Sequence, residues 1–352
     1  MKLFEPLKLG ELTLANRIVM APMTRNRAEA DFTPNALMAQ YYAQRADAGL
    51  IITEGVSPSM TGIGYCRQPA IETAAQVAAW RRITDAVHAR GGLIALQVMH
   101  AGRIGSSHIK PAGVETVAPS AVRAGGAVYT DSAGMQPFDT PRALRTEEIA
   151  AVVREYGQAA LNARAAGFDA VELHGTSGYL PMQFLYSETN RRDDAYGGSA
   201  ANRARFAVEC LRAMVDAIGA GRVGLRLNPG NEFNDCRDAD SVASHAELMR
   251  QAAPLGLAWL EIMRAPTSDI DAFGLAREHF AAALILNDGF EAETAERALE
   301  QGQGQAVSFA RHFVGNPDLV RRLREGLPLA KFDRKTLYTP GAAGYTDYPA
   351  LR

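Results

Sequence analysis

Short apolar runs recur along the whole chain, and each is followed by a longer segment of helical character. A run that is apolar at nearly every position is typical of a strand buried on both faces, as in parallel sheets. Eight such repeats suit one closed (β/α)8 TIM barrel of the α/β class, and we expect residues 1–352 to form a single domain. An open doubly wound sheet is the alternative, but no GxGxxG motif follows the first run. The predicted strands are 17–22, 50–55, 93–100, 170–173, 223–227, 259–263, 284–286 and 306–309.

The segments between these strands predict helices, several of which are closed by a glycine. Thr146 is expected to cap one of them, because Glu147 and Glu148 follow it. Two parts of the chain lie outside the repeat. Residues 2–19 read as a short hairpin that leads into the first strand. Residues 104–145, rich in Gly, Pro, Ser and Thr, predict an irregular excursion that caps the barrel or forms a lid. The predicted helices are 35–48, 73–90, 146–166, 199–218, 240–254, 272–281, 291–301 and one after Pro317.

Charge and cysteine content argue against several classes of function. The formal net charge is −2 and no long basic run occurs, so we expect neither a nucleic-acid partner nor binding to an anionic membrane. Cys66, Cys210 and Cys236 form no CxxC pair and are odd in number, which indicates a reducing compartment. Without a signal-peptide core in residues 1–20 or an apolar run of membrane-spanning length, a cytoplasmic location is expected. No group of His, Cys and carboxylates has metal-ligand spacing, so we expect no metal.

Polar residues gather at the ends of the predicted strands, where barrels of this kind carry their chemistry. The fourth strand ends in His174, and Ser177 and Tyr179 follow within a glycine-broken segment. A histidine, a hydroxyl and a phenol at one strand end can bind an oxygen-bearing substrate and protonate it. Gln97 on the third strand offers both a donor and an acceptor to the edge of a heterocycle.

Two arginines have alternative interpretations. Arg226 lies inside an apolar strand, where a buried guanidinium needs an acceptor. It either pairs with a buried carboxylate such as Glu172 or Glu261, or faces a ligand that gains negative charge. Arg311 and residues 287–289 follow the last two strands, where this fold commonly binds phosphate. The alternative for Arg311 is a surface ion pair.

These residues belong to a set of motifs that resembles the old yellow enzyme family of FMN-dependent ene-reductases over nearly the whole chain. Position 24 is a threonine rather than a cysteine, and in this the sequence resembles the classical branch of that family. So many ordered motifs at barrel-compatible spacing are not expected by chance. The motifs are 21–25 (APMTR), Gln97 with 100–103 (HAGR), 171–174 (VELH), 178–180 (GYL), 191–199, 202–203, 316–319 (NPDL) and 344–349 (GYTDYP).

The resemblance implies a non-covalently bound FMN, with NAD(P)H as the reductant. It assigns Thr24 to the flavin O4, Gln97 to the pyrimidine edge, and Arg226 to N1 and O2, where charge appears on reduction. The other implied cofactor positions are Pro22, Met23 and Gly55 along the ring and Gly289, Ala310 and Arg311 at the phosphate.

The resemblance also implies the reaction, a reduction of α,β-unsaturated carbonyl or nitro compounds by a monomer or homodimer. His174 and Ser177 would bind the substrate oxygen. Flavin N5 would deliver hydride to the β-carbon, and Tyr179 would protonate the α-carbon from the other face. The reductant and these small-molecule alkenes would use one pocket in turn, which implies ping-pong kinetics. The residues expected to shape that pocket are Tyr65, Met99, Phe233, Asn234 and Tyr345.

Four positions depart from the family pattern. Ser177 stands where His or Asn is usual, and a hydroxyl has a single proton to donate, so a tolerated change, an altered substrate range or a loss of activity is expected. Asp288 interrupts the usual Asn-Gly-Gly, and Ala310 replaces a glycine; both bear on FMN retention. Met99 replaces an aromatic residue and predicts a more adaptable pocket. Two other functions stay open: reduction of nitroesters or nitroaromatics, and a barrel that only binds a small molecule.

Overall fold

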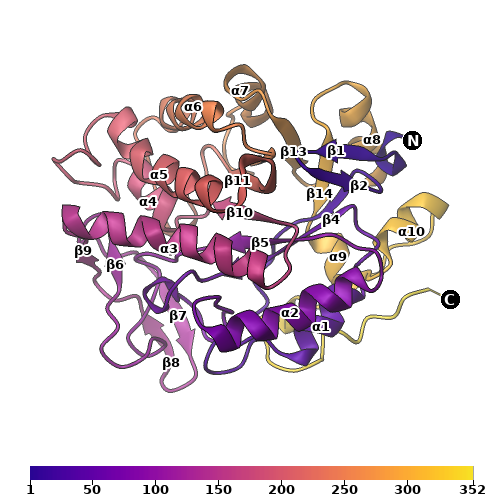
Figure 1. Cartoon of the computed structure of the whole chain (residues 1–352), viewed down its shortest axis with the longest axis horizontal. Helices are drawn as coiled ribbons and strands as arrows, with labels where there is room; N and C mark the ends of the chain where they lie inside the picture. Colours follow the sequence, from indigo (N-terminus) through magenta and orange to yellow (C-terminus); the bar gives the residue numbers. More distant parts are fainter. Residues whose placement is uncertain (352) are drawn as a thin grey trace.

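Eight parallel strands close into a barrel at the centre of the computed structural model, which describes residues 1–351 (Figure 1). The strand order is β10-β11-β12-β13-β14-β3-β4-β5. The prediction of a closed TIM barrel is therefore confirmed, and the open-sheet alternative is wrong. The strands are β3 (Ile18–Met20), β4 (Leu50–Val56), β5 (Ile94–Val98), β10 (Ala170–His174), β11 (Val223–Leu227), β12 (Trp259–Met263), β13 (Ala283–Asn287) and β14 (Ala306–Phe309).

Helices surround the barrel, and local capping explains where several of them begin. Thr73 and Gln76 form a capping box at α2, and Ser199 caps α5. The expected cap at Thr146 is wrong by one residue: Arg145 takes the cap position, and its N–H donates to Glu148 (2.7 Å). The helices are α1 (Ala36–Ala43), α2 (Ala74–His88), α3 (Thr146–Ala165), α5 (Ala200–Ile218), α6 (Ser241–Ala252), α7 (Ala272–His279), α8 (Ala292–Glu300) and α10 (Leu319–Glu325).

The helix predictions miss three details. Helix α1 ends at Ala43, and residues 44–49 form turns and bends instead of a last helical turn. Two short helices, α4 (Leu180–Leu185) and α9 (Arg311–Gly315), directly follow β10 and β14 and were not expected. Both lie at the C-terminal end of the barrel: α4 follows the strand that ends in His174, and α9 begins with Arg311.

The excursion at 104–145 contains more regular structure than the sequence suggested. Strands β7 (Ala127–Thr130) and β8 (Gly134–Pro137) form an antiparallel hairpin, visible at the lower edge of Figure 1. Strand β6 (Val117–Ala118) pairs in parallel with β9 (Arg142–Ala143). The alternation of buried and exposed residues extends over only four residues of β7, which is too short to stand out in the sequence. The expectation of a wholly irregular segment is therefore corrected.

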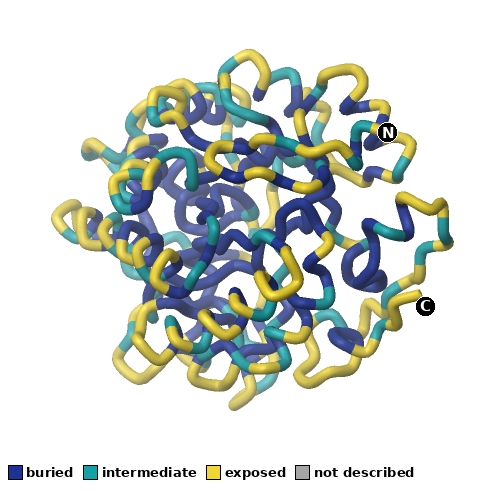
Figure 2. The backbone as a smooth tube through the Cα atoms, turned by 45° about the vertical axis from the view of Figure 1, so that its right-hand side comes forward, coloured by how far each residue is buried: buried dark blue, intermediate teal, exposed yellow. Residues whose placement is uncertain are grey.

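The N-terminal hairpin was predicted and closes the other end of the barrel. Strands β1 (Leu7–Leu9) and β2 (Leu12–Leu14) pair antiparallel. Leu9 and Leu14 pack with Val19, Leu50 and Ile285 in one buried cluster. Figure 2 shows the buried backbone concentrated in the barrel and the inner faces of its helices. With this end covered, a ligand can reach the barrel only from the C-terminal ends of its strands.

Candidate active site

A cavity of about 1100 Å3 opens at the C-terminal end of the barrel. Most of the residues expected to bind a cofactor or a substrate come together in its lining, although they are spread over nearly 300 positions of the chain. The expected residues that line it are Pro22, Met23, Thr24, Tyr65, Gln97, His174, Ser177, Tyr179, Arg226, Phe233, Ala310 and Arg311.

Five expected residues lie outside the lining. Gly55 and Met99 are behind it: a side chain on Gly55 would overlap the Met99 thioether, and Met99 packs in one cluster with Tyr179. Asn234 donates to the carbonyl of Ser177 (2.9 Å) and so supports the wall of the cavity. Gly289 is on the loop after β13. Tyr345 does not shape the pocket as expected.

Tyr345 is held in a separate buried stack. Its ring is parallel to that of Tyr41, with centroids 4.0 Å apart, and the guanidinium groups of Arg25 and Arg27 lie against it. Arg25 Nη2 also donates to the carbonyl of Gly344 (2.7 Å). The C-terminal motif therefore fixes the segment next to Thr24 rather than contacting the contents of the cavity.

Tyr179 is buried at the start of α4, and its hydroxyl is paired with that of Tyr65 (2.9 Å). Burial, together with the neighbouring Tyr65 phenol, raises the pKa of Tyr179 well above its ordinary value, so its phenol keeps its proton at neutral pH. The ring of His174 lies 5.1 Å from that of Tyr179. A protonated phenol beside an imidazole is an arrangement that can bind and protonate a substrate.

His174 and Ser177 are joined by a residue that the sequence analysis missed. Thr176 is fully buried, and its Oγ1 lies 2.8 Å from Ser177 Oγ and 3.4 Å from His174 Nδ1. Burial and the charge of Arg226 lower the pKa of His174 to about 3, which keeps the imidazole neutral. The only sequence signal for Thr176 was a hydroxyl next to Ser177 and two residues after a histidine.

Arg226 was expected either to pair with a buried carboxylate or to face a ligand, and its position is compatible with both. Its Nη1 forms an ion pair with Glu261, and its Nη2 donates to Asn287 Oδ1 (3.1 Å), so the predicted pairing with a buried carboxylate is confirmed. The same guanidinium lines the cavity. Ser308 in turn donates to Glu261 from β14. The fixed positive charge at the cavity floor can therefore stabilise an electron-rich ligand.

The carboxylate of Glu172, on the neighbouring strand β10, orients Gln97. Its Nε2 donates to Glu172 Oε1 (2.9 Å), and Trp259 Nε1 donates to Glu172 Oε2 (2.8 Å). Burial and the nearby Glu261 raise the pKa of Glu172 to about 8. Since the amide nitrogen of Gln97 is engaged inside the barrel, its carbonyl oxygen remains for a ligand.

The far edge of the cavity carries the expected phosphate residues. Ala310 and Arg311 line the cavity. Asp288 turns toward Arg264, with Oδ2 3.0 Å from Arg264 Nη1, while its Oδ1 accepts the N–H of Gly289 (2.6 Å). A side chain on Gly289 would meet only open space. The loop thus leaves room for an anion, but the carboxylate of Asp288 already occupies one of the N–H groups that would bind it.

The charge of the lining also favours an anionic ligand. Among residues 1–351, the one acidic residue of the lining is Asp131, and it is paired with Arg67. A cavity in which positive charges are in excess raises the local concentration of anions. The basic residues of the lining are Arg25, Arg67, Arg226, Arg311, Arg334 and Lys335.

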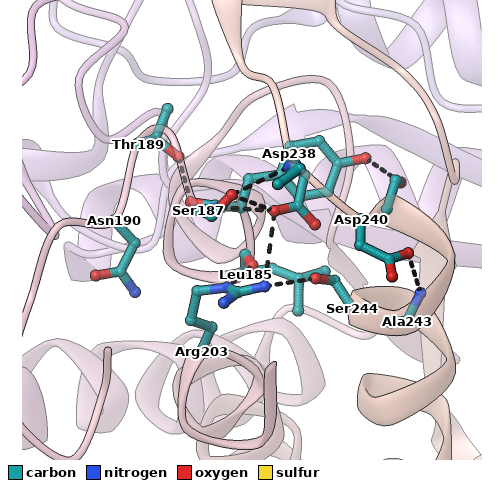
Figure 3. Close-up of polar contacts among 12 residues, drawn as sticks. Leu185, Ser187, Thr189, Asn190, Arg203, Asp238, Asp240, Ala243 and Ser244 are labelled. Carbon is teal, nitrogen blue, oxygen red and sulfur yellow. Dashed lines mark hydrogen bonds and ion pairs between the residues drawn. The ribbon is translucent and has the colours of Figure 1, made fainter. Parts of the chain in front are cut away.

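A polar network away from the cavity anchors the loop that carries Phe233 (Figure 3). Asp238 Oδ1 accepts from the N–H of Ser187 (2.9 Å) and from its hydroxyl (2.7 Å). Arg203 of α5 lies 3.6 Å from the same oxygen and donates to Ser244 of α6 (2.8 Å). The loop after β11 is therefore tied to three neighbouring elements before it reaches the cavity.

Residues 1–351 contain neither a candidate metal site nor a candidate membrane span. No cluster of three or more His, Cys, Asp or Glu side chains is arranged to hold a metal ion. No helix in this range combines the length and the apolar character needed to cross a bilayer.

The fold and the cavity define a (β/α)8-barrel enzyme with its chemistry at the C-terminal ends of the strands. The model of the NADH:flavin oxidoreductase / NADH oxidase family matches residues 2–330. A probable flavin mononucleotide-dependent alkene reductase of Leishmania infantum is 42% identical over 357 residues, covering 99% of this chain and 97% of the relative. A 12-oxophytodienoate reductase of Oryza sativa subsp. japonica is 39% identical over 359 residues, covering 99% and 93%.

Solved structures agree with these sequence matches. The old yellow enzyme homologue from Zymomonas mobilis superposes with a TM-score of 0.96 at 41% identity and covers 100% of both chains. Morphinone reductase in complex with tetrahydroNAD gives the same TM-score at 43% identity, covering 100% of this chain and 98% of the other. The chain belongs to the NADH:flavin oxidoreductase family, known as the old yellow enzyme family, and is a flavin-linked oxidoreductase.

Proposed function

We propose that this protein reduces the activated C=C bond of α,β-unsaturated carbonyl or nitro compounds, with FMN as cofactor and NAD(P)H as reductant. The observation that carries the proposal is the position of Tyr179. Its buried, protonated phenol shares one cavity with the neutral imidazole of His174 and the fixed guanidinium of Arg226. Relatives named as alkene and 12-oxophytodienoate reductases support this substrate class.

The residues present fit FMN. Arg226 and the free carbonyl oxygen of Gln97 offer opposite polarities to the edge of a planar heterocycle. Thr24 and Arg311 line the same cavity, and the open space around Gly289 leaves room for a phosphate. When bound, FMN would accept hydride from NAD(P)H and deliver it to the β-carbon of the alkene.

The side chains of the protein would supply the other parts of the reaction. His174 and Ser177 both line the cavity, and His174 can hold the substrate oxygen, so that negative charge developing there is stabilised. Tyr179 would give its proton to the α-carbon, and its raised pKa means that it holds this proton until a strongly basic centre forms. The hydroxyl of Tyr65 is placed to support Tyr179 during the transfer.

The test combines a spectrum with a variant. The purified protein should bind FMN and oxidise NAD(P)H when an enone such as cyclohex-2-enone is present. Tyr179→Phe should slow the reduction of the enone by about 10²- to 10⁴-fold, the usual contribution of a general acid, and leave the reduction of the flavin by NAD(P)H unchanged.

Tyr129→Phe is the matched control, because Tyr129 also lines the cavity but is exposed at its rim. It removes the same atom and should leave both half-reactions at the parental rate. An unchanged enone reduction rate in Tyr179→Phe would overturn the assignment of the proton donor. Protein that stays colourless after incubation with FMN would overturn the proposed function as a whole.

A further inference from the structure

The hydrogen bonds around Thr176 restrict what the cavity can offer to a substrate oxygen. Thr176 Oγ1 is the middle member of a chain that runs from Ser177 Oγ to His174 Nδ1. Its side chain is fully buried, whereas Ser177 and His174 line the cavity. The hydroxyl of Thr176 therefore acts on a ligand only through its two neighbours.

The number of protons on these three side chains limits how many of them can donate to a ligand. A neutral imidazole and a hydroxyl each have one proton, so the chain holds one each on Ser177, Thr176 and His174. Two of the three are used when both hydrogen bonds form, and the proton of Thr176 must be one of those two, because that hydroxyl does not face the cavity. One proton is left to point into the cavity, and it is carried either by His174 Nε2 or by Ser177 Oγ.

A second donor would need an imidazolium. Burial and the positive charge of Arg226 both oppose that form, and no carboxylate among residues 1–351 pairs with His174 to offset them. The direction of the hydrogen bonds between Ser177, Thr176 and His174 then decides which side chain donates to a ligand. The neutral imidazole of histidine favours its proton on Nε2, and Ser177 is only partly buried, so solvent can satisfy its oxygen.

We propose that Thr176 is a positioning residue: its hydroxyl donates to His174 Nδ1 and accepts the proton of Ser177, so His174 alone donates to the substrate oxygen. The backbone of Ser177 is held in place beside this chain of hydrogen bonds: its φ is +59°, and its carbonyl accepts from Asn234 Nδ2 (2.9 Å). The catalytic meaning of this arrangement rests on the proposed function.

The first test reads the imidazole directly and needs no activity. In protein labelled with ¹⁵N-histidine, long-range ¹H–¹⁵N spectra should show His174 with its proton on Nε2 and with Nδ1 as a hydrogen-bonded acceptor. His174→Gln assigns the signals. Thr176→Val, which has the shape of threonine without the hydroxyl, should move Nδ1 toward a free imine nitrogen, and Thr176→Ser should restore the original position.

Thr61→Val is the matched control, because Thr61 Oγ1 lies 3.3 Å from Nε2 of a different histidine, His100. It should shift the signals of His100 and leave those of His174 in place. The proposal is overturned if His174 carries its proton on Nδ1, or if Thr176→Val leaves its signals unmoved.

The second test is a double-mutant cycle on the oxidised holoprotein, with the dissociation constant of cyclohex-2-enone followed through the flavin absorbance. Ser177→Ala should change this constant less than about twofold, because the proton of Ser177 points inward. In the Thr176→Val background the hydroxyl of Ser177 is free, and Ser177→Ala should weaken binding by about two- to tenfold, the worth of one hydrogen bond. Equal effects in the two backgrounds would overturn the coupling. Failure to bind FMN or the enone would instead contradict the proposed function, and the spectra would still decide the role of Thr176.

Discussion

Replacing Asp288 by glycine should tighten the binding of FMN. In the structure the carboxylate of Asp288 accepts the N–H of Gly289 (2.6 Å) and pairs with Arg264 (3.0 Å). A phosphate that binds next to Arg311 would have to displace the first of these contacts and approach a like charge. Asp288→Gly removes the competing acceptor and the charge together.

The size of the gain follows from these contacts. A hydrogen bond to a charged group contributes about 1.5–3 kcal/mol, but FMN would gain only the difference between this bond and the internal one that it replaces. Arg264 already neutralises much of the charge of Asp288, and the added glycine costs about 0.5–1 kcal/mol of loop entropy. The net gain is therefore about 1–2 kcal/mol, or about a 5- to 30-fold lower dissociation constant.

Titration of the protein without cofactor against FMN, followed by quenching of flavin fluorescence, measures this constant. Riboflavin, which lacks the phosphate, is the control ligand, and its affinity should not change. Asp288→Asn keeps an acceptor for Gly289 but removes the charge, so its gain should be smaller. The reasoning is refuted if Asp288→Gly binds FMN no more tightly than the parent, or if riboflavin gains as much as FMN.

Three further predictions concern stability and pH. Gly224→Ala should lower the free energy of unfolding by about 3 kcal/mol or more in urea denaturation, because its new methyl would overlap the indole of Trp259; an unchanged midpoint would contradict this. Burial lowers the pKa of His245 to about 4, so below pH 6.5 the unfolded chain takes up a proton that the folded chain refuses. The stability advantage of the parent over His245→Gln should therefore shrink by about 1.4 kcal/mol per pH unit between pH 6.5 and 4, and a constant difference would refute this. Because His174 stays neutral above about pH 3 and the pKa of Tyr179 is raised well above its ordinary value, the rate of enone reduction should show no step near pH 6.5; a histidine-like inflection there would exclude a neutral His174.

The barrel could be predicted from the sequence because each of its strands is apolar at nearly every position. Strands β11, β12 and β14 have the predicted bounds, since a run of four or five residues buried on both faces has few other interpretations. The hairpin of β7 and β8 was missed because only Val128 and Thr130 of β7 turn inward. Helix α4 was missed because Tyr179 and Leu180 read as the end of a glycine-broken loop, and all of its residues are buried, so it lacks the amphipathic pattern of a surface helix.

The residues of the candidate site could be predicted from the sequence where their role depends on a position at a strand end. His174 and Arg226 are paired in register on β10 and β11, so their meeting in the cavity follows from the barrel itself. Tyr345 could not be placed in this way, because it is distant in the sequence from every strand and its position depends on a stack with Tyr41. Thr176 was missed for a different reason: its contacts depend on side-chain rotamers, which no spacing rule supplies.

The interior of the barrel explains why the cavity-facing groups are fixed before any ligand binds. Gln97 is held by Glu172, and Arg226 is held by Glu261, so each cavity-facing group has a carboxylate below it on a neighbouring strand. Burying two carboxylates with one guanidinium is unfavourable by itself, and the raised pKa of Glu172 is one consequence. The result is a preorganised site. The carbonyl oxygen of Gln97 and the positive charge of Arg226 keep fixed directions, so they need not reorganise as charge develops on a ligand. Loss of either carboxylate should therefore disturb the cofactor more than its distance from the cavity suggests, because it releases the group above it.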